Sequence, residues 1–204
     1  EWVTRFHRLT LRKIQITPIV FKRIFTRKLE RLKLILPSTC YAGIDDLLFF
    51  FERKVLNQHL VTVWMHGDFK HENIIHDQAG EYVRGVIDWD LSEHPGIPMV
   101  DIFYFLAYLE SPRKSCDIFE VLEKKIIPGV FTNEEKDVIT VYSQYLGLRE
   151  ADIILYKIFF LIHHIVCRNS YHLVVSWDGK EQMLKQKILP FFSRICMLLK
   201  EEGF

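Results

Sequence analysis

Apolar residues recur at helical spacing in the first quarter of the chain. Thr17 followed by Pro18 predicts a helix start, because threonine caps helices and proline is tolerated in the first turn. From there apolar positions fall three or four residues apart as far as Leu36, and Pro37 ends the pattern. A second helix is predicted over residues 44–57. Basic side chains are expected on the exposed face of the first helix, namely Lys22, Arg23, Arg27, Lys28 and Arg31.

The period changes at residues 61–65, which are β-branched and aromatic and predict a short strand. Two further strand-like runs cover residues 73–76 and 82–89. Residues 77–80 between them, Asp-Gln-Ala-Gly, are typical of a turn. The sequence therefore predicts an antiparallel hairpin.

After Pro98 the pattern is helical to the end of the chain. Thr132 begins a capping box, and Gly147 is a natural helix stop. Pro190 predicts a break or kink in the last helix. The predicted elements are helices over 99–109, 132–147 and 152–168, a turn at Asp178-Gly179, and a helix from Lys180 onward.

This order of elements predicts an α+β fold that is mainly helical. Residues 1–60 form an expected helical lead-in, residues 61–98 a small β cluster, and residues 99–204 a second helical segment. The chain has 204 residues, of which 49% are hydrophobic, enough for one sizeable core or two small ones.

Charge and cysteine usage narrow the class of protein. The formal net charge of +1 gives no global field that would attract nucleic acid, although the basic helix above could meet an anionic surface. None of the four cysteines forms a C-x-x-C pair, so buried, reduced thiols and a cytoplasmic location are expected. The longest apolar run, residues 153–167, is too short and too interrupted for a membrane span and predicts a core helix.

The β cluster carries most of the candidate chemistry. It contains His66-Gly67-Asp68-Phe69-Lys70-His71-Glu72-Asn73, and then Ile87-Asp88-Trp89-Asp90 after the hairpin. Phosphoryl transfer needs positioning and charge neutralisation more than covalent chemistry. Asp68 could take the proton of an attacking hydroxyl, while Asn73 and Asp88 offer the hard oxygen ligands that Mg²⁺ prefers.

The hairpin explains how Asn73 and Asp88 can meet. Asn73 enters its first strand and Asp88 leaves its second, and an antiparallel return places these two ends side by side. One tight turn thus brings a loop and a metal-binding aspartate together.

The segments HGDFKHENII and VIDWD resemble the catalytic loop and metal-binding motif of the aminoglycoside phosphotransferase and choline kinase family. That family shares its core with protein kinases, whose motifs are H-R-D-x-x-x-x-N and D-F-G. The resemblance implies the C-terminal lobe of a protein-kinase-like fold, with Mg²⁺ and ATP or GTP as cofactors. Gly67 stands where protein kinases carry arginine, which favours a small-molecule acceptor.

Supporting roles follow from the same resemblance. Lys70 could stabilise charge on the transferring phosphoryl group. His66 is expected to hold the loop through hydrogen bonds rather than to act in catalysis, and Asp101 is expected to brace the loop from a helix. Residues 2–10 are similar to the helix that follows the interlobe linker of the family.

The resemblance implies that residues after the metal-binding aspartate and in the C-terminal helices shape the acceptor pocket. Of the paired histidines His163 and His164, one is expected in the core and one at the surface. The absence of a concentrated acidic cluster disfavours a polycationic aminoglycoside. Candidate pocket residues are Asp90, Glu93, His94, Arg168 and Trp177.

Two alternatives stay open. No glycine-rich phosphate loop precedes Asp68, so the nucleotide-covering N-terminal lobe is expected to be absent and the chain alone to turn over poorly. The chain could then be a non-catalytic pseudokinase or scaffold module. A metal-dependent hydrolase is the other alternative, with His66, Asp68, His71, His76 and Asp88 as its metal-site residues.

Overall fold

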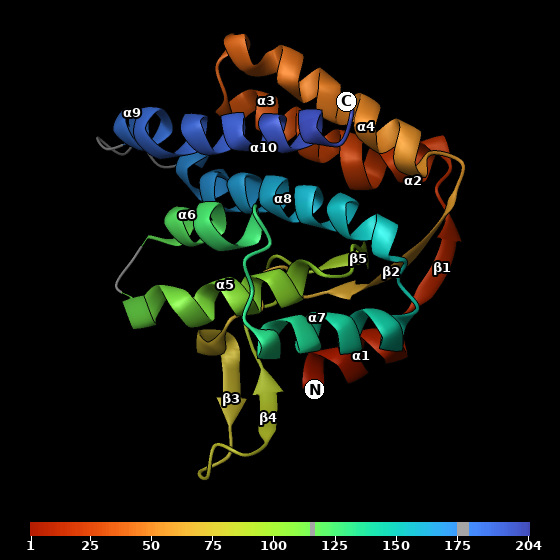
Figure 1. Ribbon diagram of the computed structural model, residues 1–204, viewed down its shortest axis with the longest axis vertical. Coiled ribbons are helices and arrows are strands. Elements are labelled where there is room, and N and C mark those ends of the chain that lie inside the picture. The colour runs from red at the N-terminus through yellow and green to blue at the C-terminus, as the bar shows by residue number, and fades with distance from the viewer. Residues whose placement is uncertain (115–116, 175–179) are drawn as a thin grey trace. The chain divides into compact units, whose positions relative to one another are not determined.

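The computed structural model describes residues 1–114, 117–174 and 180–204 (Figure 1). The chain forms two compact units, each built from two separate stretches. Unit 1 comprises residues 1–13 and 61–157, and unit 2 comprises residues 14–60 and 158–204. These units are discontinuous, whereas the sequence suggested three consecutive segments. The difference arises because helices from the early part of the chain pack with helices from its end.

Unit 1 holds the sheets and the helices around them. Strands β1 and β2 cross the boundary between the units along the chain. Helix α1 has the bounds that the family resemblance suggested. The elements are α1 (Trp2–Thr10), β1 (Arg12–Gln15), β2 (His59–Met65), β3 (Ile74–His76), β4 (Val83–Val86), β5 (Glu93–Gly96), α5 (Val100–Lys114), α6 (Ile118–Val121) and α7 (Asn133–Leu146).

Two small sheets confirm the α+β class. One has the strand order β1-β2-β5, with β2 antiparallel to β5 and Met65 opposite Glu93. The other is the predicted hairpin, in which β3 and β4 pair antiparallel with Ile74 opposite Val86. The hairpin extends away from the helices of unit 1 (Figure 1).

Strand β1 corrects the helical lead-in expected for residues 1–60, and β5 lies in the part of the predicted β cluster, residues 90–98, to which no element was assigned. β1 is mostly exposed and has no alternating apolar pattern. β5 includes Pro95 and Gly96, both depleted in strands. Both strands exist because they pair with β2, a contact between distant parts of the sequence.

The predicted helix ends are confirmed where local chemistry sets them. The hydroxyl of Thr17 accepts a hydrogen bond from the backbone N–H of Val20. Thr132 and Glu135 form a complete capping box at the start of α7. Gly147 ends that helix with a φ of 66°, the left-handed conformation that glycine adopts without strain.

Unit 2 is helical, with an apolar core. Phe25 lies 4.8 Å from Phe51 and 5.5 Å from Phe159, measured between ring centroids. The helical elements of unit 2 are α2 (Pro18–Phe21), a π-helical turn (Lys22–Thr26), α3 (Arg27–Ile35), α4 (Tyr41–Val55), α8 (Ile153–Val174), α9 (Lys180–Met183), another π-helical turn (Leu184–Ile188) and α10 (Leu189–Glu201). The first residues of α8 belong to unit 1, and this helix confirms the core helix predicted over residues 152–168.

Burial corrects two expectations in unit 2. Lys28 was expected on the exposed basic face, but it is buried, with its Nζ 2.8 Å from Nδ1 of His163. Lys28 lies four residues after Ile24 and four before Leu32, which are both buried, so helical spacing places it on the apolar face despite its charge. His163 and His164 are both fully buried, whereas one was expected at the surface.

Three further expectations concern the cysteines, the turn at residues 178–179 and membrane-spanning helices. Cys40 and Cys196 are only half-buried rather than enclosed in the core. The predicted turn at residues 178–179 lies outside the described residues. Within the described ranges, every helix falls short of the length and apolar character that crossing a bilayer requires.

Candidate active site

Gly67, the second residue of the loop that follows β2, could not be replaced by another residue without rearrangement of its surroundings. Gly67 has a φ of 85°. A Cβ atom added there would lie 2.2 Å from the carbonyl oxygen of Leu91. A side chain, including the arginine that protein kinases carry here, is therefore excluded by the neighbouring backbone.

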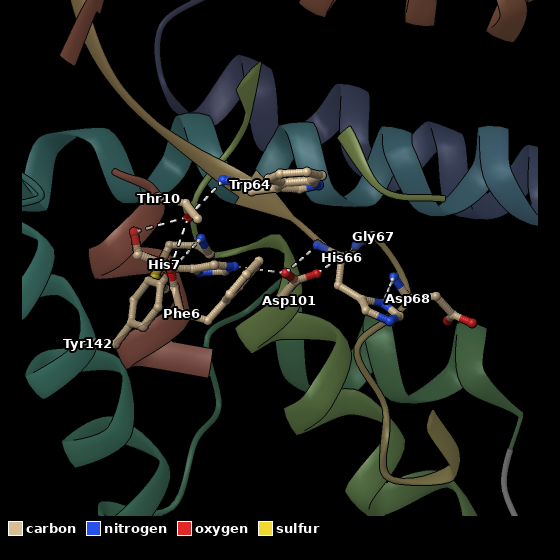
Figure 2. A network of polar contacts seen from close by, with 10 residues as sticks. Phe6, His7, Thr10, Trp64, His66, Gly67, Asp68, Asp101 and Tyr142 are labelled. Carbon is tan, nitrogen blue, oxygen red and sulfur yellow. Dashed lines mark hydrogen bonds and ion pairs between the residues drawn. The ribbon is translucent and has the colours of Figure 1, made fainter. Parts of the chain in front are cut away.

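Asp101, near the start of α5, holds this loop through its backbone (Figure 2). Its two carboxylate oxygens accept hydrogen bonds from the backbone N–H groups of His66 and Gly67, each at 2.8 Å. The ring Nε2 of His7 lies 3.0 Å from the same carboxylate. Asp101 and His7 are fully buried. These are the contacts that a bracing aspartate would make.

The network continues from His7 to α7. Nδ1 of His7 lies 2.6 Å from the hydroxyl of Tyr142, which accepts a hydrogen bond from the backbone N–H of Met99. Burial raises the pKa of Tyr142 well above its ordinary value, so the hydroxyl stays protonated. Tyr142 then donates to Nδ1 of His7, and Nε2–H of His7 donates to Asp101. Sequence analysis missed His7 and Tyr142, which are 135 residues apart.

His66 connects the loop to the far strand of the hairpin. Its Nδ1 accepts from the backbone N–H of Asp68 at 3.2 Å, and its Nε2 donates to the carbonyl oxygen of Ile87 at 2.9 Å. Both ring nitrogens are thus engaged. The ring is unsuited to metal binding and suited to the holding role suggested for it.

The polar side chains of the loop converge on Asp68. The Nζ of Lys70 lies 2.7 Å from Oδ2 of Asp68. The carboxamide nitrogen of Asn73 donates to the carbonyl oxygen of Asp68 at 2.9 Å and reaches Oδ2 of Asp68 at 3.3 Å. Because the nitrogen of Asn73 faces Asp68, its carboxamide oxygen remains available as a ligand.

Charge at Lys70 reflects two opposing effects. Partial burial by itself lowers the pKa of the ammonium group, but the hydrogen bond and charge of Asp68, with smaller contributions from Tyr108 and Glu72, raise it above the ordinary value. Lys70 is therefore cationic at neutral pH. It keeps a positive charge directly beside the candidate base.

Asp88 is brought to this loop by the hairpin. The backbone N–H of Ile87 donates to the carbonyl oxygen of Asn73 at 3.0 Å, so the two segments lie side by side as predicted. Asp88 has a φ of 64°, a left-handed conformation that turns the chain at the end of the strand. Its carboxylate is exposed, and no described residue forms a hydrogen bond or ion pair with it.

The kinds of side chain near Asp68 indicate which metal ion could bind there. Among described residues, no three His, Cys, Asp or Glu side chains gather around one metal position. The histidine-rich site of a hydrolase is therefore not formed, and His71 and His76 are exposed. One carboxamide oxygen and one carboxylate nonetheless fit Mg²⁺, which commonly takes one or two protein ligands and completes its shell with phosphate and water oxygens.

Aromatic side chains from α1, which sequence analysis also missed, line the loop. The ring of Trp2 stacks on Phe69 at 6.1 Å, and Phe6 meets Trp89 edge-on at 5.4 Å. Trp89 also lies 4.6 Å from the ring of His66. These ring contacts connect α1 to the loop and to the residues after the hairpin.

The predicted acceptor residues are only partly described. Asp90 is exposed just after Asp88. Glu93 and His94 lie on β5, where Glu93 is opposite Met65 and His94 is 5.7 Å from Trp64. The side chain of Arg168 and the whole of Trp177 lie outside the described part of the chain. Their grouping into one pocket stays a prediction.

Comparison with known protein families finds a match to part of the chain. Residues 26–116 match the model of the phosphotransferase enzyme family. The match confirms the resemblance inferred from the motifs, and its range includes Asp68, Asn73, Asp88 and Asp101. No curated protein and no solved structure matches the chain.

Proposed function

We propose that this chain provides the catalytic and magnesium-binding lobe of a kinase-type phosphotransferase, with a protein-kinase-like architecture. It would move the γ-phosphoryl group of ATP or GTP to a hydroxyl group of a small molecule. The family match supports phosphotransfer in general. The arrangement of the loop supports the particular roles of its residues.

One observation carries the proposal. The Asn73 side chain donates to Asp68 while its backbone carbonyl accepts from Ile87, next to Asp88. A candidate base and two candidate metal ligands are thereby held in one hydrogen-bonded unit. Such an arrangement serves phosphoryl transfer, in which positioning and charge neutralisation dominate.

The residues have separate tasks in this mechanism. Asp68, half-buried and paired with Lys70, accepts a hydrogen bond from the acceptor hydroxyl and takes up its proton. Asn73 and Asp88 would hold Mg²⁺, which neutralises phosphate charge when bound with the nucleotide. Lys70 stabilises negative charge on the transferring group. His66 and Asp101 keep the loop in position.

The acceptor is proposed to be a small molecule because the close backbone at Gly67 leaves no room for the arginine of protein kinases. Sugars, amino alcohols, amino acids, nucleosides and antibiotics all carry suitable hydroxyl groups. Asp90, Glu93, His94, Arg168 and Trp177 are the residues proposed to select among them.

The test is a comparison of Asp68→Asn with Asp137→Asn in the protein that carries this chain. Nucleoside diphosphate release would be measured with Mg-ATP and Mg-GTP over a panel of these acceptors. Loss of the base should lower the rate about 10²- to 10⁴-fold. Asp137, exposed on α7, is the matched control and should leave the rate unchanged. Equal rates for Asp68→Asn and the unaltered protein would favour a non-catalytic binding module instead.

A further inference from the structure

Three residues on one face of α5 contact successive parts of the candidate catalytic loop. Asp101, Phe105 and Tyr108 are spaced at i, i+4 and i+7, so they lie on the same side of the helix. Asp101 binds the backbone at the start of the loop (Figure 2). The ring of Phe105 lies 5.8 Å from that of Phe69.

Tyr108 completes this series at Lys70. The Nζ of Lys70 lies over the Tyr108 ring, 5.4 Å from its centroid. The same Nζ is 2.7 Å from Asp68 and 3.7 Å from Glu72. The ammonium group thus has a carboxylate on one side, a second and more distant carboxylate on another, and an aromatic face on the third.

On the basis of the function proposed above, we propose that Tyr108 is a positioning residue. Its ring face holds the Lys70 ammonium group beside Asp68, where the phosphoryl group would be transferred. Tyr108 acts by positioning Lys70, and the tyrosine itself need not touch substrate.

Physical reasons favour an aromatic ring at this position. Lysine is a long, flexible side chain, and Glu72, whose side chain is 57% exposed, offers a competing partner toward solvent. An aromatic face attracts a cation through its quadrupole, most strongly where water is partly excluded. The side chain of Lys70 is 17% exposed and that of Tyr108 is buried, which meets this condition.

The Tyr108 ring also holds the ammonium group without adding a net charge to the site. A third carboxylate would bind an ammonium N–H strongly and would add negative charge where phosphate oxygens must arrive. The quadrupole of Tyr108 adds attraction without net charge. The remaining N–H groups of Lys70 can therefore turn toward an incoming phosphoryl oxygen while Asp68 keeps its own contact.

A purely structural role is the competing explanation, because Tyr108 packs near Tyr104 with ring centroids 6.0 Å apart. Tyr104 is therefore the matched control. It lies one turn earlier on the same helix, and Tyr104→Leu removes the same chemical group from the core as Tyr108→Leu.

The first measurement does not depend on activity. In protein labelled with ¹³C-lysine, the ε-methylene resonance of Lys70, assigned from Lys70→Met, should be shifted upfield by the tyrosine ring. The shift should persist in Tyr108→Phe and Tyr104→Leu and disappear in Tyr108→Leu. A resonance with no ring shift, or one unchanged in Tyr108→Leu, overturns the proposal.

The second measurement is a double-mutant cycle on nucleoside diphosphate release from Mg-ATP, with water or the best acceptor of the panel. Tyr108→Leu should lower kcat about 3- to 30-fold, the range expected for one cation–π contact. Tyr108→Phe should retain the rate within about 2-fold. In the Lys70→Met background, Tyr108→Leu should change kcat by less than about 2-fold.

The outcomes separate the two proposals. The same fold-loss from Tyr108→Leu in both backgrounds means a structural role and overturns the positioning role. If the unaltered protein shows no phosphotransfer on any acceptor, the proposed function fails. The resonance of Lys70 then decides alone whether Tyr108 positions the ammonium group.

Discussion

Both units bury polar side chains, including the Lys28–His163 pair of unit 2, but those of unit 1 form a network that reaches the candidate catalytic loop. In unit 1, His7, His66, Asn73 and Asp101 are buried and joined by hydrogen bonds. In unit 2, aromatic rings such as Phe25 and Phe51 dominate the core. Burial of polar groups costs free energy unless every group is paired, whereas burial of aromatic rings stabilises directly.

The difference shows what each kind of core accomplishes. Hydrogen bonds favour a direction as well as a distance, so the polar network of unit 1 constrains the orientation of the loop. Aromatic packing in unit 2 supplies stability and tolerates small adjustments. We therefore expect substitutions in unit 1 to affect activity and stability together, and substitutions in unit 2 to affect mainly stability.

The largest expected effect is that of Asp101→Ala. It would leave two buried backbone N–H groups and the ring of His7 without their acceptor. Removing one partner from a buried charged network typically costs about 3–5 kcal/mol. Urea unfolding followed by tryptophan fluorescence would measure this, since Trp2, Trp64 and Trp89 all lie in unit 1.

Asp101→Ala should also lower phosphotransfer in protein that remains folded, because the loop loses its backbone brace. Asp137→Asn on the exposed side of α7 is the control for both measurements. A stability close to that of the unaltered protein would mean that the polar network contributes little to unit 1.

Phe25→Ala is the matched change in unit 2. Phe25 is 1% exposed and contacts rings on α4 and α8, so its removal leaves a cavity. A cost of about 3–5 kcal/mol is typical of such a truncation. Amide hydrogen exchange, measured by peptide, should lose protection chiefly in residues 14–60 and 158–167.

The contrast with Asp101→Ala lies in activity. Folded Phe25→Ala protein should keep its kcat for phosphotransfer within about 2-fold, because no side chain of the candidate site changes. A large fall in kcat without unfolding would contradict the separation of tasks between the two cores. Phe25→Leu, which keeps most of the apolar volume, is the milder comparison.

Local chemistry made part of this molecule predictable. The hairpin, the capping box and the stop at Gly147 each depend on a few consecutive residues. The spacing of Asp68 and Asn73, with Asp88 at the hairpin end, predicted that their backbones would lie together. Their roles in catalysis and metal binding stay predictions.

What could not be predicted depends on contacts between distant residues. β5 contains Pro95 and forms only by pairing with β2. Lys28 is buried against His163, which lies 135 residues away, so the residues near Lys28 in the sequence carry no sign of this contact. His7 and Tyr142 are ordinary residues in their own helices. Their role depends on a third residue, Asp101, so periodicity within one helix carries no trace of it.

Alkaline pH should lower the stability of the two units over different pH ranges, an effect smaller than those of Asp101→Ala and Phe25→Ala. Burial, helped by the charge of Asp46 and by Cys40, raises the pKa of Cys196 in unit 2 from 9.0 to about 11. A raised pKa means that the stabilising contribution is complete below pH 9.0 and is lost as pH rises through about 11. In unit 1, burial raises the pKa of Tyr142 from an ordinary value of 10.0, so its contribution declines only at higher pH.

Urea midpoints measured by far-UV circular dichroism between pH 9 and 11 would test this order. The midpoint of the unaltered protein should fall across this range, and Cys196→Ala should flatten the fall. The slope with pH is the decisive quantity, because Cys196→Ala also changes packing beside Gly43. Parallel slopes for the two proteins would rule out the thiol as the cause.

The smallest expected difference is between the two threonine caps. Thr132 in unit 1 bonds the backbone of Glu135, and Glu135 returns a bond to the backbone of Thr132, so Thr132→Ala breaks a reciprocal pair. About 1 kcal/mol of unfolding free energy should be lost. Thr17 in unit 2 makes one bond, 3.4 Å long, and Pro18 already sets the first helical turn. Thr17→Ala should therefore cost less than Thr132→Ala in urea unfolding, and equal or reversed costs would show that the second half of the box contributes nothing.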